Sequence, residues 1–291
     1  MKEFRDILTK NYNESNVVIY GVPFDCNCSI GAGSMKAPQK LRELSYWLPA
    51  YSMDGKPLSH IKVFDNDDFE VHSFNDIEKN SNIFNDDKLK VIFGGDHSIS
   101  IPFQEKFIKK AKEDNKIPVL IHIDAHCDIC DIYLGSKYSH ACTVRRAIDN
   151  GLEDENLYMI GIREFEKDGY DYLINRKNDV NLYKASDVMD IGMEKIAKSI
   201  FKKLNNDKYA VYISFDIDSL DASYVPGTGT PETCGLTPFM IKTLFENIAK
   251  LENIYCLDIV EVSPPLDIND ITSWCAIKLF YEFLANHTPK H

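Results

Sequence analysis

An apolar segment, 118–123, runs directly into Asp124, His126 and Asp128, and this junction constrains the fold more than any other feature of the chain. The segment is rich in β-branched residues, which is typical of a strand buried inside a parallel sheet. Side chains two apart on a strand point to the same face. If the extended conformation continues to Asp128, two carboxylates and an imidazole converge at the carboxyl end of the strand, where open α/β sheets bind ligands.

Two further apolar segments end in the same kinds of side chain. Segment 211–215 leads into Asp216 and Asp218, and segment 90–93 leads into the sequence Gly-Gly-Asp-His at 94–97. Because the carboxyl ends of parallel strands meet at one edge of a sheet, we expect all three groups to lie together.

Strand-like segments alternate with segments of helical spacing along the whole chain, which predicts a parallel sheet with helices on both faces. We expect an α/β fold: a single-domain, three-layer α/β/α sandwich with a mainly parallel eight-stranded sheet, spanning residues 1–291. The expected strands are 17–20, 61–64, 90–93, 118–123, 157–160, 180–184, 209–215 and 254–262. The expected helices are 38–47, 99–111, 140–149, 168–175, 188–204, 238–251 and 271–284. Residues 65–86, rich in Asn and Asp, predict irregular surface structure.

The composition excludes several classes of protein. A hydrophobic content of 44% and a charged content of 27% are ordinary for a globular protein. No apolar run approaches the roughly 20 residues of a membrane helix. The charged residues 1–6 lack the apolar core of a signal peptide, so we expect a cytoplasmic protein. The net charge of -12 argues against nucleic acid as a partner and is compatible with a cationic substrate.

Eight cysteines are present, and in a chain without an export signal they predict free thiols. Cys127 and Cys130 have the spacing of a redox or zinc pair, but a zinc site would need a second such pair, and none is present. We therefore expect the cysteines to be structural or incidental.

The candidate metal ligands are His97, Asp124, His126, Asp128, Asp216 and Asp218. Four carboxylates in one pocket repel each other and raise each other's pKa, and a buried unpaired charge costs several kcal/mol. Two divalent cations would balance the four negative charges. Oxygen-rich ligation with two imidazoles and no thiolate favours Mn²⁺ over zinc. Each motif taken singly is weak, since Asp and His are common at strand ends; the agreement of three motifs makes the prediction specific.

The glycine-rich segments do not predict a nucleotide site. Gly94-Gly95 follows a strand but lacks the spacing of a dinucleotide or phosphate-binding loop. Residues 226–231, Pro-Gly-Thr-Gly-Thr-Pro, have no accompanying Lys or Arg. Close backbone packing beneath a metal site is the better interpretation.

Taken together, the segments 94–98 (GGDHS), 124–128 (DAHCD) and 214–221 (SFDIDSLD) resemble the three metal motifs of the ureohydrolase family, the arginases and agmatinases. Segments 21–25, 226–231 and 261–265 also resemble motifs of that family, so the resemblance covers most of the chain. It implies a binuclear manganese hydrolase, with two Mn²⁺ per chain, that cleaves a guanidino group to urea and an amine.

The resemblance also implies a role for each candidate residue. One ion would be held by His97, Asp124, Asp128 and Asp216. The other would be held by Asp124, His126, Asp216 and Asp218. Metal-bound water is a strong nucleophile because its pKa is lowered to about 7, and Asp128 would orient it. Glu261 would hold the guanidinium group through paired hydrogen bonds. His140 would be the proton shuttle to the departing amine.

His122 is a further histidine near the candidate ligands, and the chain departs from the family pattern in two places. His122 lies on the same face of its strand as Asp124, and we expect it to support ligand orientation rather than bind metal. The family pattern has Gly-Thr after the shuttle histidine where this chain has Ala141-Cys142, and Pro where it has Ala222. Neither departure removes a ligand or an acid–base group.

The loop 129–139 resembles the agmatinase version of a loop that reads the far end of the substrate. The favoured reaction is therefore agmatine plus water giving putrescine and urea. Guanidinobutyrate, guanidinopropionate or arginine stay open as substrates. A non-catalytic relative that acts as a binding partner is disfavoured by the intact ligand set. The resemblance further implies a homo-oligomer, either a trimer or a hexamer.

Overall fold

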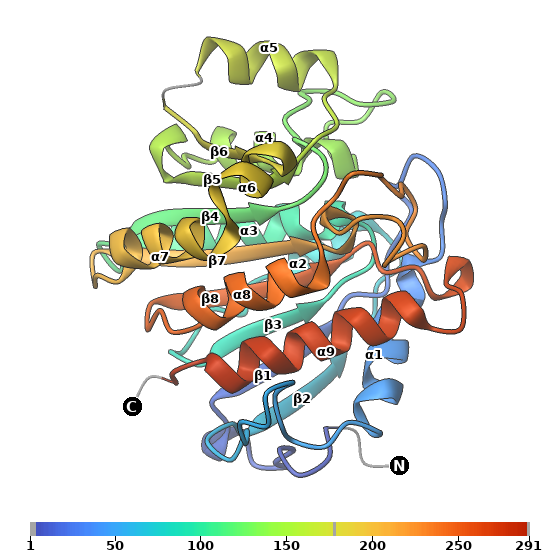
Figure 1. The fold of residues 1–291 in the computed structure, drawn as a ribbon, viewed down its shortest axis with the longest axis vertical. Helices are drawn as coiled ribbons and strands as arrows, with labels where there is room; N and C mark the ends of the chain where they lie inside the picture. Colours follow the sequence, from blue (N-terminus) through green and yellow to red (C-terminus); the bar gives the residue numbers. More distant parts are fainter. Residues whose placement is uncertain (1–3, 177–178, 290–291) are drawn as a thin grey trace.

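The structure, a computed structural model, describes residues 4–176 and 179–289 (Figure 1). Its eight strands form one sheet in the order β2-β1-β3-β8-β7-β4-β5-β6, and every pairing is parallel. The strands are β1 (Val17–Gly21), β2 (Val63–Asp68), β3 (Leu89–Phe93), β4 (Ile117–Ile123), β5 (Leu157–Ile162), β6 (Asn181–Lys184), β7 (Tyr209–Asp216) and β8 (Ile254–Val260). The predicted α/β fold with a parallel sheet is confirmed.

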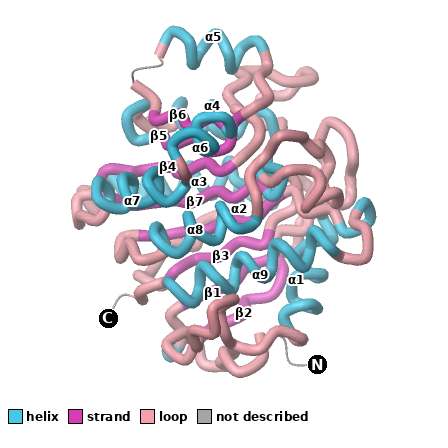
Figure 2. Tube along the Cα trace, in the orientation of Figure 1, coloured by secondary structure: helices cyan, strands magenta, loops and turns pink. Residues whose placement is uncertain are grey.

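Helices cover both faces of the sheet and make the outer layers of the sandwich (Figure 2). One layer packs through the first of two buried apolar clusters and consists of α1 (Ala37–Ser45), α6 (Ala185–Ile191), α7 (Met193–Leu204), α8 (Pro238–Ile248) and α9 (Ile271–Asn286). The other packs through the second cluster and consists of α2 (Phe74–Asn80), α3 (Ser100–Glu113), α4 (Thr143–Asp149) and α5 (Lys167–Asn175). In Figure 1, α7, α8 and α9 lie in front of the sheet.

The strands are apolar on both faces because each face is covered. In β1, Val17 and Ile19 belong to one apolar cluster, whereas Val18 and Tyr20 belong to the other. This alternation follows from the two-residue period of a strand. It explains why these strands are nearly continuous apolar runs rather than alternating ones.

The order of the strands brings four distant segments to one edge. β3, β8, β7 and β4 are consecutive neighbours, although β7 and β8 come more than 80 residues after β4 in the chain. Since all four strands are parallel, their carboxyl ends lie together. The residues that follow or end these strands are His97, Glu261, Asp216 and Asp124.

Segment 65–86 is more regular than predicted. β2 continues through Asp65 to Asp68, and α2 lies within the same segment. β2 is an edge strand that pairs only with β1, so polar side chains can face solvent along it. Arg42 of α1 also pairs with both Asp65 and Asp68, which stabilises this end of the strand.

The predicted helix 188–204 is wrong as one element. Gly192 has φ of 90° and ψ of 128° and separates α6 from α7. That backbone region is essentially restricted to glycine, so a continuous helix cannot pass through it. Two other boundaries also differ: β8 ends at Val260, and α4 begins at Thr143 after a 3₁₀ turn at His140–Cys142.

Among the described residues, no helix is long and apolar enough to span a bilayer. All the described strands belong to one sheet, but the extent of the domain over 1–291 stays a prediction.

Candidate metal centre and active site

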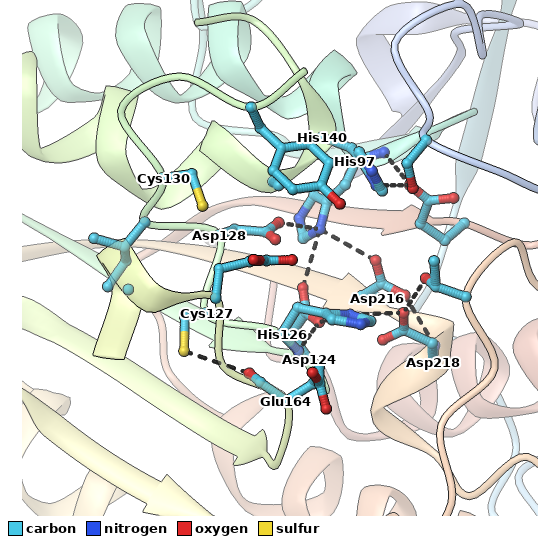
Figure 3. A pocket seen from close by; sticks show the side chains of 18 of the residues that line it. His97, Asp124, His126, Cys127, Asp128, Cys130, His140, Glu164, Asp216 and Asp218 are labelled. Carbon is cyan, nitrogen blue, oxygen red and sulfur yellow. Dashed lines mark hydrogen bonds and ion pairs between the residues drawn. The ribbon is translucent and has the colours of Figure 1, made fainter. Parts of the chain in front are cut away.

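The ring of His97 lies at the centre of one group of candidate ligands. Its Nδ1 atom is 3.1 Å from an Oδ2 atom of each of Asp124, Asp128 and Asp216 (Figure 3). His97, Asp124 and Asp216 are almost fully buried, and Asp128 is 7% exposed. These four residues are the set predicted for one metal ion.

His126 lies at the centre of a second group. Its Nδ1 atom is 3.1 Å from Oδ2 of Asp218 and 3.4 Å from Oδ1 of Asp124. Asp124 therefore contributes one oxygen to each group, which is the arrangement expected of a bridging carboxylate. Asp216 Oδ1 accepts a hydrogen bond from the backbone N–H of Asp218, and this turn holds the two aspartates side by side.

The donor set fits divalent cations. Three carboxylate oxygens surround one ring nitrogen of His97, which can offer at most one N–H. His97 Nδ1 and Asp124 Oδ2 are buried, and neither has a hydrogen-bond partner among the described residues. Burial raises the pKa of Asp216, and the neighbouring Asp218 and Asp124 raise it further. Cations between these groups would remove both the repulsion and the unmet hydrogen-bonding demand.

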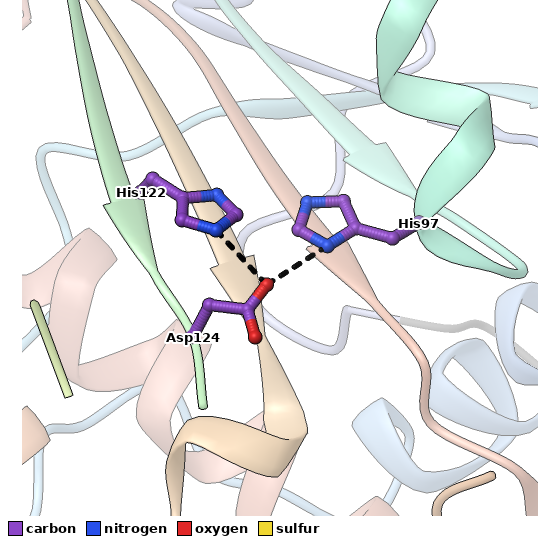
Figure 4. Close-up of side chains that lie close together, drawn as sticks. All are labelled: His97, His122 and Asp124. Atoms are coloured by element: carbon purple, nitrogen blue, oxygen red, sulfur yellow. Dashed lines mark ion pairs between the residues drawn. The ribbon is translucent and has the colours of Figure 1, made fainter. Parts of the chain in front are cut away.

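His122 is a second histidine beside Asp124. Its Nε2 atom is 3.1 Å from Asp124 Oδ2, and the rings of His122 and His97 lie side by side and point to the same oxygen (Figure 4). The rings of His122 and His97 stack with centroids 5.2 Å apart. His122, His97 and Asp124 could hold an ion by proximity alone. His97 is the better centre because three carboxylates face it, whereas one faces His122.

The extended conformation does not continue to Asp128, so that part of the prediction is wrong. β4 ends at Ile123, and Asp128 has a φ of 51° in the left-handed region. The side chains still converge because the chain turns back toward the strand ends. The backbone N–H of Arg145 and the hydroxyl of Thr143 hold Asp128, donating to its carbonyl oxygen and to Oδ2.

Glu261 also adopts an unusual backbone conformation, with a φ of 62°. Left-handed residues other than glycine cost free energy, and they concentrate at functional sites. Glu261 is 4% exposed, and its Oε1 atom accepts a hydrogen bond of 2.7 Å from the backbone N–H of His97. This contact joins the ends of β3 and β8 at the floor of the pocket.

His140 lies next to Glu261, with Nδ1 3.5 Å from Oε1. Burial disfavours the charged ring, but the hydrogen bond and charge of Glu261 outweigh it and raise the pKa of His140 to about 9. Its Nε2 atom is buried without a hydrogen-bond partner among the described residues. The ring lines the pocket and is protonated at neutral pH in the metal-free structure.

A buried hydrogen-bond chain behind His97 was not predicted. Ser214 Oγ donates to Asp258 Oδ1 at 2.7 Å and lies 2.8 Å from His97 Nε2. Because the Ser214 hydroxyl hydrogen is used on Asp258, its oxygen accepts from Nε2–H of His97, leaving the Nδ1 lone pair toward the carboxylates. Tyr212 and Ser100 donate to the other oxygen of Asp258. In the sequence, only the presence of Asp258 within the apolar segment 254–260 could have indicated this hydrogen-bond chain.

The metal-ligand candidates and His140 line a cavity of about 420 Å³. The lining adds three carboxylates that sequence reasoning missed: Glu164, Glu166 and Glu232. Tyr133 also lines the cavity and belongs to the loop predicted to contact the far end of the substrate. Among the described lining residues there is no Lys or Arg. Lys137 lies over the ring of Tyr138, outside this lining.

The cysteines of the described chain are free. Cys127 and Cys130 line the cavity, and burial raises the pKa of Cys130 to about 12. They belong to none of the clusters of described residues that could hold a metal ion. Of the departures from the family pattern, Ala141 lines the cavity, whereas Cys142 and Ala222 do not.

Comparison with known proteins agrees with the fold and identifies the family. A sequence model described as the arginase family matches residues 15–285. The chain therefore belongs to the arginase family, whose hydrolases are metal-dependent and act on guanidino compounds.

Three relatives narrow this class. The chain is 34% identical over 287 residues to an agmatinase of Bacillus cereus, covering 94% of this chain and 92% of the relative. It is 32% identical over 275 residues to a guanidinobutyrase of Pseudomonas aeruginosa, covering 91% and 84%. The crystal structure of the agmatine ureohydrolase of Thermoplasma volcanium matches with a TM-score of 0.84 at 31% identity, covering 98% of this chain and 94% of that chain. The chain is thus an arginase-family ureohydrolase resembling agmatinases and guanidinobutyrases.

Proposed function

We propose that this chain is a binuclear manganese hydrolase that converts agmatine and water to putrescine and urea. One observation carries the choice of substrate: the described cavity lining includes Glu164, Glu166 and Glu232 and no Lys or Arg. Agmatine has a guanidinium group at one end and an ammonium group at the other. The ammonium group would be attracted to these carboxylates, whereas a substrate carboxylate would be repelled by them.

The two predicted ligand sets would hold the metal ions. His97, Asp124, Asp128 and Asp216 surround one position, and Asp124, His126, Asp216 and Asp218 surround the other. When bound, Mn²⁺ supplies a water of lowered pKa that serves as the nucleophile toward the guanidinium carbon. The choice of Mn²⁺ rests on the chemistry of the donors: oxygen atoms and two imidazoles, with no thiolate.

The remaining residues bind the substrate and move the proton. Glu261 is a buried carboxylate at the pocket floor, suited to accept two hydrogen bonds from a guanidinium group. Asp128, held by Thr143, would accept a hydrogen bond from the nucleophilic water and orient it. His140 would deliver a proton from its ring to the nitrogen of the departing amine, and putrescine would leave carrying that proton.

A second candidate substrate is 4-guanidinobutyrate. It is favoured by the 32% identity to a guanidinobutyrase over 275 residues. The same hydrolysis would apply, but the substrate's carboxylate would need a cationic or hydrogen-bonding partner. The lining offers the hydroxyl of Tyr133 for this purpose.

The test is urea release by the Mn²⁺-loaded protein, with agmatine, 4-guanidinobutyrate and arginine compared at equal concentrations. We expect kcat/KM to be greatest for agmatine by at least about tenfold, equivalent to about 1.4 kcal/mol. Replacing Glu166 with Gln should raise the KM for agmatine and narrow its advantage over guanidinobutyrate. Faster turnover of 4-guanidinobutyrate by the unmodified protein would contradict the proposed substrate. If the fully metal-loaded protein releases no urea from any of the three compounds, the substrate is a different guanidino compound.

A further inference from the structure

The side chain of Arg163, immediately after β5, is surrounded by backbone carbonyl groups. Its guanidinium nitrogens lie 2.8–3.2 Å from six carbonyl oxygens, those of Gly161, Asp218, Ser219, Leu220, Glu232 and Thr233, and its five N–H groups donate to them, with the two on Nη2 shared among three acceptors. Its hydrogen-bond partners are main-chain oxygens, and no carboxylate of the described residues forms an ion pair with it. A cation held in this way joins segments of backbone rather than balancing a neighbouring charge.

Both segments that Arg163 joins carry residues of the candidate site. The turn 217–220 carries Asp218, and the loop 226–236 carries Thr230 and Glu232. The hydroxyl of Thr230 donates to Asp218 Oδ2 at 3.1 Å. An oxygen of Glu232 lies 4.0 Å from His126 Nε2. The loop therefore contacts the His126–Asp218 group directly.

The backbone of Arg163 reaches the third segment of the same group. Its N–H donates to the carbonyl oxygen of Ala125 at 2.8 Å, and Ala125 lies between Asp124 and His126. One residue thus connects the segments that carry Asp124, His126 and Asp218. By contrast, His97 is held by Glu261 and Ser214, which Arg163 does not contact.

Gly235 leaves the space that the guanidinium group occupies. A Cβ atom added at Gly235 would lie 2.6 Å from Nη2 of Arg163 and 2.5 Å from the backbone nitrogen of Asp221. The loop can close around the arginine only because no side chain is present there. The arginine and the glycine therefore form one packing arrangement.

We propose that Arg163 is a positioning residue that holds Asp218 and Glu232 in place relative to Asp124 and His126. It sets the affinity for the metal ion at the His126–Asp218 position and, through Glu232, the KM for the cationic end of the substrate. This inference rests on the proposed function in assigning a metal ion to that position. Arginine is required because its five donors form a fixed planar fork, whereas lysine offers three donors from a single point.

The experiment is a calorimetric titration of the metal-free full chain with Mn²⁺, comparing the unmodified protein with Arg163→Lys. We expect one of the two binding steps to weaken about 10–100-fold, as for other residues that orient metal ligands, and the other to change less than about threefold. Amide hydrogen exchange in residues 226–236 of the metal-free protein should also become faster, since the contacts of Arg163 with the carbonyl oxygens of Glu232 and Thr233 in this loop are weakened. With saturating Mn²⁺, the KM for agmatine should rise more than kcat falls.

Arg42→Lys is the matched control. Arg42 is buried, and it makes a forked contact to Asp65 at the far edge of the sheet. This variant should lower the melting temperature and leave both Mn²⁺ affinities unchanged. If Arg163→Lys behaves in the same way, or weakens both steps equally, Arg163 has only a structural role and the proposal is wrong.

A second variant covers the case in which Arg163→Lys does not fold. Gly235→Ala keeps the charge and moves the guanidinium group, so it should also weaken one binding step selectively; unchanged affinities would overturn the proposal. The metal titration and the exchange measurement need no substrate. Failure of agmatine hydrolysis in the unmodified protein would therefore reject the proposed substrate while leaving the test of Arg163 intact.

Discussion

Asp128 combines a left-handed backbone conformation with a carboxylate that faces His97. Its φ is 51°, and its Oδ2 atom lies 3.1 Å from His97 Nδ1 and 3.0 Å from the hydroxyl of Thr143. The same hydroxyl lies 2.7 Å from the carbonyl oxygen of His140, so its single hydrogen is shared between these two acceptors. One threonine thus ties the candidate metal ligand to the candidate proton shuttle. The backbone strain at Asp128 is consistent with a position selected for its chemistry.

Replacing Asp128 with Asn should abolish activity and leave the protein folded. The amide keeps the shape of the side chain but loses the charge that a metal ion and the nucleophilic water require. We expect kcat to fall by more than the roughly 100-fold that loss of an outer partner of a metal ligand costs. Urea release and thermal unfolding are the measurements. Asp131→Asn, an exposed carboxylate in the same loop that pairs with Arg146, is the control. Activity of Asp128→Asn near that of the control would rule out the assigned role.

Replacing His140 with Ala should lower kcat by about 10²–10⁴, the usual contribution of a positioned acid or base. The bound Mn²⁺ should be retained, because Nδ1 of His140 faces Glu261 and not the ligand oxygens. Metal analysis and steady-state kinetics on the same preparation test this. His72→Ala, which removes an exposed imidazole, should have no effect. A change confined to KM would show that His140 binds substrate without transferring a proton.

At the scale of elements, helices and strands begin and end where the local sequence predicts, provided that contacts with the rest of the fold favour the same boundary. α8 begins as expected: Thr237 caps it by accepting a hydrogen bond from the N–H of Met240, and Pro238 takes the first helical position. The predicted boundaries that were wrong are those that depend on contacts with other segments of the chain. β2 extends over four polar residues because it is an edge strand paired with β1 and supported by Arg42.

Gly192 is the position where an element boundary depends on one residue. Replacing it with Ala should lower the free energy of unfolding by about 1–3 kcal/mol, because its backbone conformation is strained for any residue with a Cβ. Steric contact is not the reason, since nothing lies within 4 Å of an added Cβ. Urea denaturation measures the change. Ser199→Ala, an exposed position inside α7, should stay within about 0.5 kcal/mol of the unmodified protein. Equal stabilities of the two variants would disprove the strain at Gly192.

At the scale of the whole molecule, the site is a concentration of negative charge in a protein that is already acidic. The net charge is -12, and the cavity adds Glu164, Glu166 and Glu232 to the candidate metal ligands. The negative electrostatic potential of these groups would raise the local concentration of a dication such as agmatine at the cavity and repel anionic analogues. The homo-oligomer and the cytoplasmic location expected from the sequence stay predictions.

Mn²⁺ should raise the melting temperature of the metal-free protein because the ions bind only the folded arrangement of ligands. At a free concentration 100 times the dissociation constant, one site adds about 2.7 kcal/mol to the free energy of unfolding. Differential scanning calorimetry with and without a chelator measures this. Asp124→Asn should lose most of the effect, since Asp124 reaches both groups. A melting temperature that does not respond to Mn²⁺ would argue against a metal centre assembled from these residues.

Most of the fold and of the site could be predicted from the chain because the informative signals are local. Apolar runs that end in His97, Asp124 and Asp216 indicate both a buried parallel sheet and the edge where ligands gather. The structure places these side chains around one point, as expected. Gly192, Asp128 and Glu261 show the limit: their backbone conformations depend on turns and contacts that no periodicity reports.

The sequence by itself determined the alternation of strands and helices and the metal-type side chains at the strand ends, since these follow from residue type and spacing, and its motifs carried the resemblance to the family. Only the tertiary structure decided which strands are neighbours, because the insertion of β7 and β8 between β3 and β4 depends on the packing of the whole sheet. For the same reason, the meeting of Glu164 and Glu232 in one cavity and the carbonyl contacts of Arg163 with Ser219 and Glu232 are visible only in the folded chain, since these partners lie about 55–70 residues apart in the sequence.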